Sequence, residues 1–353
     1  MSRRGINRNG VQGVQVYVRR QGDTDYEQIQ PQTDLFPLVG NITTVLDRAF
    51  LLLESERGWD GLETIARGIV VGRREAEDNC LFPDPQFPSL GDAIRHFLQA
   101  MKGVFPDIYL TYLEGEALTA RYPVEPPFRS LLEFDTLRAG ELRIQYQYIY
   151  NMAQTRNNDW FNTWVFRMAL SIAHELTHFF TGYLTGDGRP ITPPGVSVRG
   201  WPTGEAGRAW ELETFGGIVE FWSEGRDPSQ PGEPIIFADF RSTTPGLPVS
   251  RSYVEAFAGG VVRLPITPSR RARPITRQQL QAAGRREMNI LRGSRGTGEA
   301  PGVSVSRAGR GGSSGSGATT SSTTRNRAPP PQPLTGYYYP PADSEDGRDP
   351  YYR

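Results

Sequence analysis

Residues 158–186 read NDWFNTWVFRMALSIAHELTHFFTGYLTG, and this stretch decides the fold of the chain. Apolar side chains recur along almost all of it, which predicts one long helix. Asn158 or Asp159 is a suitable N-cap, because its side chain can accept a hydrogen bond from a free amide of the first turn. Gly182 and Gly186 supply the stop signals at the other end. We expect the rest of the chain to be organised around this helix.

An H-E-x-x-H motif lies inside the predicted helix, at residues 174–178. His174 and His178 are four residues apart, so both imidazoles leave the same face about one turn apart. That spacing suits two nitrogen ligands on one Zn²⁺ ion. Glu175 points in a different direction, where it can take a proton from a water molecule that the metal activates. The motif therefore predicts a catalytic zinc site.

The alternative is that both histidines are satisfied core residues and that Glu175 is simply exposed. The chain has only three histidines, so this spacing around a Glu arises by chance in roughly one of a few hundred chains. Burying two imidazoles and a carboxylate without partners costs several kcal/mol. The metal interpretation is favoured. The third histidine, His96, lies beside the apolar face of another predicted helix, and there a structural role is favoured.

Charge and cysteine content exclude several classes of function. Lys+Arg and Asp+Glu both total 39 in the 353 residues, so we expect no nucleic acid and no membrane as the main partner. Lys102 is the one lysine, which removes a P-loop lysine and makes Schiff-base chemistry improbable. Cys80 is the one cysteine, so an internal disulfide and a cysteine-cluster metal site are excluded.

The N-terminus shows no apolar signal region, and no apolar run reads as long enough to span a bilayer. The predicted metal helix itself carries Arg167 among its apolar residues. We therefore expect an intracellular, soluble protein, cytoplasmic or nuclear.

Hydrophobic periodicity predicts both strands and helices ahead of the metal helix. Alternation predicts a first strand near residues 14–18, and further strands within 107–122, 131–135 and 141–150. A helix is expected over 43–56, a short helical or strand-like segment over 62–71, a loop over 80–88, and a helix capped by Ser89. A mixed α+β fold follows.

Behind the metal helix, the sequence predicts a second helix from about residue 203 to 224, a proline-rich loop over 225–250, a strand or helix over 253–262 and a polar helix over 276–291. Three parts are expected: a flexible arm 1–13, a catalytic domain 14–292 and a disordered tail 293–353 of low complexity. The tail segment Tyr337–Pro341 could dock on an SH3 or WW type of domain, although its composition favours a plain disordered tail.

A catalytic zinc usually has three protein ligands, and no histidine follows His178, so the third ligand should be a carboxylate. On the predicted second helix Glu211 shares a face with Phe215, Ile218 and Trp222, which is costly unless the carboxylate binds a cation. Glu211 is therefore the expected ligand. Glu205, in the expected first turn, is the alternative ligand or an acceptor that orients a ligating histidine. A third reading pairs Glu211 with Arg208.

Several motifs around these residues resemble a group of uncharacterised fungal zincin-like proteins. The motifs are HELTH at 174–178, GYLTG at 182–186, TPP at 192–194, GEAGRAWE at 204–211 and FGG at 215–217. The resemblance covers roughly residues 140–222. It implies a zinc-metallopeptidase domain of the gluzincin type, in which an edge strand of a mixed sheet holds an extended peptide beside the metal helix. The sequence departs from the thermolysin-like pattern at Phe215, where an Asp is expected.

The leading hypothesis is zinc-dependent hydrolysis of a peptide bond in a peptide or protein substrate, with Glu175 as general base. Tyr183, Tyr253 and Arg208 are the candidate donors to the substrate carbonyl oxygen. The alternative is an inactive, zinc-stabilised scaffold whose tail recruits partner proteins. A nucleic-acid binder that uses the basic residues 270–273 is a weaker third hypothesis.

Overall fold

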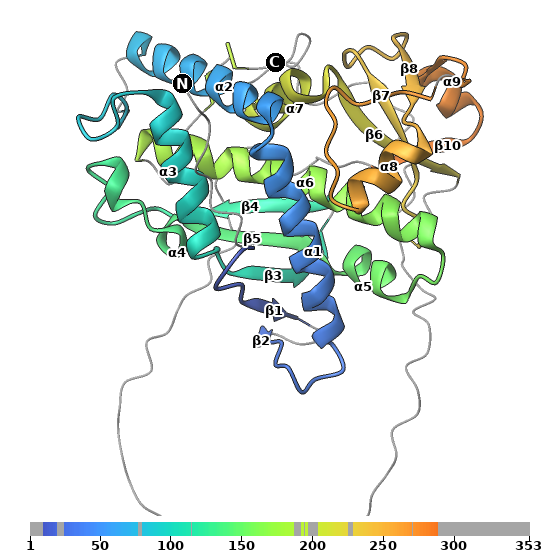
Figure 1. Cartoon of the computed structure of the whole chain (residues 1–353), viewed down its shortest axis with the longest axis horizontal. Helices are drawn as coiled ribbons and strands as arrows, with labels where there is room; N and C mark the ends of the chain where they lie inside the picture. Colours follow the sequence, from blue (N-terminus) through green and yellow to red (C-terminus); the bar gives the residue numbers. More distant parts are fainter. Residues whose placement is uncertain are drawn as a thin grey trace, which may run out of the picture. The chain divides into compact units, whose positions relative to one another are not determined.

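Figure 1 shows a computed structural model of the whole chain. It describes residues 10–19, 25–76, 80–113, 115–186, 192–193, 195–196, 204–224, 229–269 and 271–288. Contacts between residues divide the chain between Glu299 and Ala300. All described residues belong to the first unit. Arg270 and the tail segment Tyr337–Pro341 lie outside them.

Five strands form a first, mixed sheet in the order β2-β1-β3-β5-β4. Neighbours β1, β3 and β5 run parallel, whereas β2 and β4 are antiparallel to their neighbours, which leaves β4 at one edge. The chain is thus a mixed α and β protein, as its periodicity predicts. The strands are β1 Val16–Val18, β2 Glu27–Gln28, β3 Ile108–Thr111, β4 Ala117–Arg121 and β5 Gly140–Gln145.

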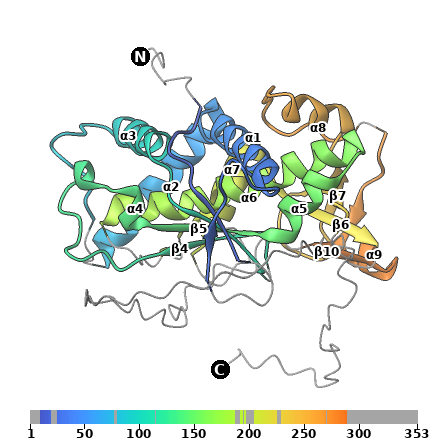
Figure 2. The same ribbon diagram turned by 90° about the horizontal axis from the view of Figure 1, so that it is seen from below.

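Helices α1 (Phe36–Leu53) and α3 (Leu90–Gly103) lie over one face of this sheet, and α2 (Glu56–Glu75) packs against α3 (Figures 1 and 2). Ser89 caps α3 as expected, its side chain accepting from the amide of Asp92. Two expectations need correction. Helix α1 begins at Phe36 instead of near residue 43, and the segment at 62–71 belongs to the 20-residue helix α2.

Helix α1 is long and apolar enough to cross a membrane by length and composition, contrary to the expectation that no run would be. It is the one such helix among the residues described. Its buried side chains, among them Val45, Leu46 and Leu53, belong to the core, and it packs along the metal helix. This packing is that of a core helix.

The predicted central helix is α6, Asn158–Thr185, with Gly186 as its left-handed C-cap. Its N-cap is Asn157, one residue earlier than expected, and the Asn157 side chain accepts from the amides of Asp159 and Trp160. Its side chains from Trp164 to Phe180 are all buried. Helices α1 and α7 and strand β4 contact it, so α6 is the centre of the core.

The segment ahead of α6 differs from its alternating pattern. Residues 131–135 contain a 3₁₀ turn, Leu131–Glu133, instead of a strand, and α4 (Thr136–Ala139) precedes β5. The strand expected over 141–150 ends at Gln145, where α5 (Tyr146–Gln154) begins. Ile149 and Met152, three residues apart, are the buried positions of α5, a helical spacing that overrides the apparent alternation.

The expected second helix is shorter than predicted. Helix α7 spans Ala206–Phe215 and ends at Gly216, whose φ of 75° is the left-handed conformation that terminates helices. Ile218 begins strand β6, so Ile218 and Trp222 are not on the helix that carries Glu211. The helical phase used to select Glu211 is therefore invalid beyond Phe215.

The chain after α7 builds a second, antiparallel sheet in the order β10-β6-β7-β8-β9. Strands β7 and β8 lie where a loop was expected, and the polar helix expected over 276–291 is confirmed only for its first part, α9. Glu220 and Arg277 form a buried ion pair between β6 and α9. The strands are β6 Ile218–Glu224, β7 Glu233–Phe237, β8 Pro245–Pro248, β9 Ile275–Thr276 and β10 Arg285–Met288. The helices are α8 Arg251–Ala258 and α9 Arg277–Ala282.

Candidate metal centre

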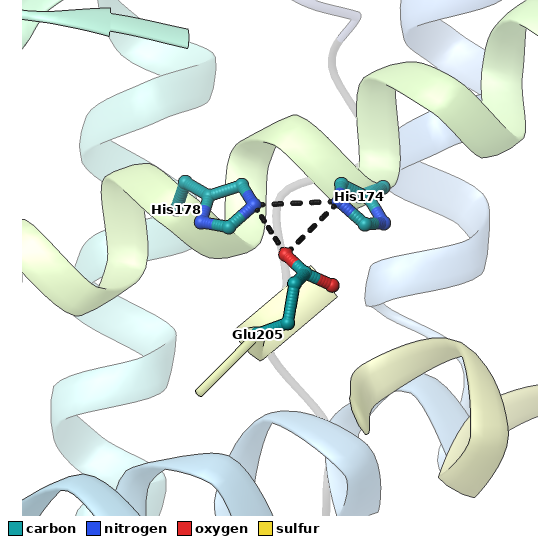
Figure 3. A group of neighbouring side chains, drawn as sticks. All are labelled: His174, His178 and Glu205. Atoms are coloured by element: carbon teal, nitrogen blue, oxygen red, sulfur yellow. Dashed lines mark hydrogen bonds and ion pairs between the residues drawn. The ribbon is translucent and has the colours of Figure 1, made fainter. Parts of the chain in front are cut away.

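Helix α6 and the start of α7 bring three ligand atoms together (Figure 3). Nε2 of His178 lies 2.9 Å from Oε1 of Glu205 and 3.3 Å from Nε2 of His174. Nε2 of His174 lies 3.4 Å from the same Glu205 oxygen. All three residues are buried, and among the described residues they form the one cluster that could hold a metal ion.

The distances between these atoms match the edges of a coordination tetrahedron. Ligands at about 2.05 Å from Zn²⁺ in tetrahedral geometry are about 3.3 Å apart. The two distances that involve His174 agree with that value, and the third is shorter by about 0.4 Å, as for a hydrogen-bonded pair. Two imidazoles and one carboxylate are also a donor set that zinc takes in catalytic sites. The residues present therefore fit a zinc ion.

Glu205 is the carboxylate that reaches the histidines. It is the N-cap of α7, and its Oε2 accepts from the amide of Arg208 at 2.5 Å while Oε1 faces the imidazoles. The sequence placed Glu205 in the first turn and ranked it second, because no local pattern shows which end of a helix approaches α6.

Glu211 lies on the other side of the His174 ring. Its Oε1 is 2.7 Å from Nδ1 of His174, and its Oε2 accepts from Nη1 of Arg208 at 2.9 Å. The expected pairing with Arg208 is thus present. The expected position of Glu211 as third ligand does not fit this arrangement, since the ring nitrogen that it contacts faces away from His178 and Glu205. Glu205 thus lies at the position expected of Glu211, and Glu211 lies where an acceptor that orients His174 was expected of Glu205.

Glu175 is held by the edge strand. Its Oε2 accepts from the backbone amide of Thr119 on β4 at 2.7 Å, and its carbonyl oxygen accepts from the Thr119 hydroxyl at 2.9 Å. Its Oε1 is buried and has no hydrogen-bond partner among the residues that the structure describes. One carboxylate oxygen is therefore oriented by the strand, and the other remains able to accept a proton. The sequence did not single out Thr119.

Three side-chain contacts align β4 with α6 in parallel. Ser171 donates to Glu116, Thr119 contacts Glu175, and Arg121 donates to Thr181. Five strand residues span about 17 Å and ten helix residues about 15 Å, so the two elements stay in register over this length. Arg167 donates to Glu116 from inside the core. This buried Glu116–Arg167 pair fixes the edge strand beside the metal motif.

The charges of the site favour a cation. Glu175, Glu205, Glu211 and Arg208 are all buried, and with both imidazoles neutral their formal charges sum to about −2. Burial alone would lower the pKa of His174, but Glu205 and Glu211 outweigh it and raise that pKa to about 10. Burial likewise would raise the pKa of Glu205, yet the two histidines hold it well below its usual range. Additional positive charge is thus stabilised at this place.

Two expected carbonyl donors lie elsewhere. The Tyr183 hydroxyl is 3.0 Å from Nδ1 of His96, within a cluster of aromatic rings. Tyr253 packs on Phe166, which lies eight residues before His174 and hence about 12 Å away along α6. Burial raises the pKa of both phenols. Arg208 is at the centre, but its Nη1 binds Glu211. The contacts of His96 are those of a packed structural residue.

Comparison of the chain with models of protein families, with curated proteins and with solved structures gives no match.

Proposed function

We propose that this chain is a zinc-dependent hydrolase that cleaves a peptide bond. His174, His178 and Glu205 hold the ion in this proposal, and Glu175 is the general base. The observation that carries it is the convergence of three ligand atoms, from α6 and the start of α7, within 3.4 Å of one another. On α6, the neighbouring residue Glu175 has a carboxylate oxygen with no hydrogen-bond partner among the described residues. When bound, zinc lowers the pKa of a water in its open position and polarises a substrate carbonyl.

The groups of this chain then perform the proton transfers. Oε1 of Glu175 accepts a proton from the attacking water and passes it to the leaving amine. The Thr119 amide holds Oε2, which leaves Oε1 as the proton acceptor in this scheme. Arg208 binds Glu211 in this scheme, so it is not assigned as the donor to the substrate carbonyl oxygen. Three ligands leave one coordination position open, which favours catalysis over a closed structural site.

A peptide is the favoured substrate because β4 is the edge of the first sheet. Glu116 accepts from Gln145 on β5, and Tyr122 donates to Ala139 just before that strand, so by alternation the backbone groups of Ala117, Thr119 and Arg121 point away from β5. The Thr119 amide is bound to Glu175, so a peptide would pair with the backbone groups of Ala117 and Arg121. An extended peptide can add to such an edge by main-chain hydrogen bonds. A mixed sheet with an antiparallel edge strand beside the metal helix also supports the zincin-like interpretation.

Zinc content and peptide cleavage test the proposal on the full chain. We expect about one zinc per chain in the wild type and in Glu175→Gln, and loss of zinc in His178→Ala and Glu205→Ala. Glu175→Gln should cleave a peptide library about 10²–10⁴-fold more slowly, since it loses the general base. Glu213→Ala, a change at an exposed position on α7, is the control and should match the wild type.

The outcomes separate the alternatives. Undiminished cleavage by Glu175→Gln contradicts its role, and full zinc content in Glu205→Ala contradicts the ligand assignment. A wild-type chain that holds zinc and cleaves no peptide supports the inactive, zinc-stabilised scaffold instead.

A further inference from the structure

Arg208 contacts both carboxylates of the site, through different parts of the residue. Its backbone amide donates to Oε2 of Glu205, the ligand carboxylate, and its guanidinium donates to Oε2 of Glu211, which contacts His174. Arg208 is 3% exposed, and its guanidinium lies 5.5 Å from the Phe240 ring. One buried residue therefore links the carboxylate on one side of His174 to the carboxylate on the other.

The contact of Glu211 sets the chemical state of the His174 ring. An ionised carboxylate only accepts hydrogen bonds, so the 2.7 Å contact requires a hydrogen on Nδ1 of His174. When a cation binds the ring, this hydrogen stays on Nδ1, and the ligand lone pair is that of Nε2, the nitrogen that faces Glu205 and His178. A carboxylate on the distal nitrogen also fixes the ring orientation and raises its basicity as a ligand.

Glu211 needs a countercharge to hold the His174 ring, because its carboxylate is buried. It is 1% exposed, and a buried carboxylate without a countercharge strongly destabilises a fold. Among the described residues, the cation that contacts it is Arg208, at 2.9 Å. The Arg208 guanidinium thus supplies a countercharge within hydrogen-bond distance of the Glu211 carboxylate.

We propose that Arg208 and Glu211 are positioning residues that act as a unit: Arg208 holds the Glu211 carboxylate in place, and Glu211 fixes the orientation and tautomer of His174 for metal binding. This inference rests on the proposed metal site. It assigns no contact with substrate to either residue. It also explains why Arg208, although central, is a poor candidate for a donor to the substrate.

A double-mutant cycle on zinc affinity tests the unit. The variants are Arg208→Met, Glu211→Gln and the double variant, measured by competition with a chelator of known affinity on the full chain. Each single change should weaken zinc binding by about 10–100-fold. Since both act through the same contact to His174, the double variant should bind within about threefold of the weaker single variant. Arg251→Met, an exposed arginine on α8, and Glu213→Ala are the matched controls.

A second measurement reads the ring directly. The chain has only three histidines, so ¹⁵N-histidine labelling gives few signals to assign. The wild type should show a slowly exchanging Nδ1–H proton on His174. This signal should shift or disappear in Arg208→Met, whereas the signals of His96 should stay unchanged. If Arg208→Met fails to fold, the double variant is measured in its place, because its Glu211→Gln change leaves no uncompensated carboxylate there.

The outcomes distinguish this inference from the proposed function. Zinc binding in the wild type with unchanged affinity in Arg208→Met overturns the inference and leaves the function standing. Multiplicative losses in the double variant also overturn it, because they mean independent effects. A wild type that binds no zinc removes the proposed function. The Nδ1–H signal of the metal-free chain then decides the inference, with an unchanged signal in Arg208→Met overturning it.

Discussion

Gly207 is the residue on which the approach of α7 to His174 depends. A Cβ atom at this position would overlap Cε1 and Nε2 of the His174 ring, the second of which is a proposed ligand atom. We expect Gly207→Ala to weaken or abolish zinc binding and to destabilise the fold by about 1–3 kcal/mol, because α7 must move away from α6. Zinc content and thermal unfolding of the purified variant measure both effects.

Gly40→Ala is the matched control for this prediction. Gly40 is an exposed helical glycine on α1, and a Cβ there meets no atom within 4 Å. The same substitution should stabilise the chain there, by about 0.5–1 kcal/mol, and leave zinc content unchanged. Equal zinc content in both variants would contradict the role of close packing at Gly207.

At the scale of elements, the Glu116–Arg167 ion pair holds the edge strand against the central helix. Both side chains are fully buried, and Arg167 also donates to the carbonyl of Pro231 and lies 4.5 Å from the Tyr148 ring. Arg167→Met leaves Glu116 as an uncompensated buried charge. We expect a loss of about 3–5 kcal/mol in the free energy of unfolding, measured by urea titration.

Replacing both partners should cost less than replacing one. In the double variant Glu116→Leu/Arg167→Met no buried charge is left alone, so its stability should exceed that of Arg167→Met. Arg251→Met, at an exposed ion pair, should change the free energy of unfolding by at most about 0.5 kcal/mol. If Arg167→Met is as stable as the wild type, the pair does not hold β4 to α6.

At the scale of the whole molecule, a bound metal would tie α6 to α7 across the core. Because zinc binds the folded chain and has no such site in the unfolded one, it should stabilise the fold by about 2.7 kcal/mol at a hundred times its dissociation constant. Chelation should then lower the midpoint of thermal unfolding by about 4–5 °C. Glu205→Ala, which lacks a ligand, should show no shift on chelation, and a wild type that does not respond contradicts the site.

Elements fixed by interactions between residues close in the sequence could be predicted, and elements fixed by distant residues could not. Helix α3 with its Ser89 cap, helix α6 and strands β1, β3 and β4 were correctly placed, because caps and periodicity act within a few residues. The second sheet was missed, since its strands are short and gain stability only from distant partners. The sequence contains a helix-stop signal for α7, Gly216-Gly217. The prediction extended the helix past it, because Ile218 and Trp222 fit the helical phase of Glu211.

The sequence by itself determined the local half of the candidate site. His174, Glu175 and His178 follow from helical geometry, because residues one and four apart on one helix have fixed relative directions. Only the tertiary structure decided which carboxylate meets them. Glu205 and Glu211 belong to another helix, and which one faces Nε2 of His174 depends on how α7 packs on α6. That packing is the sum of many long-range contacts, which no local pattern contains.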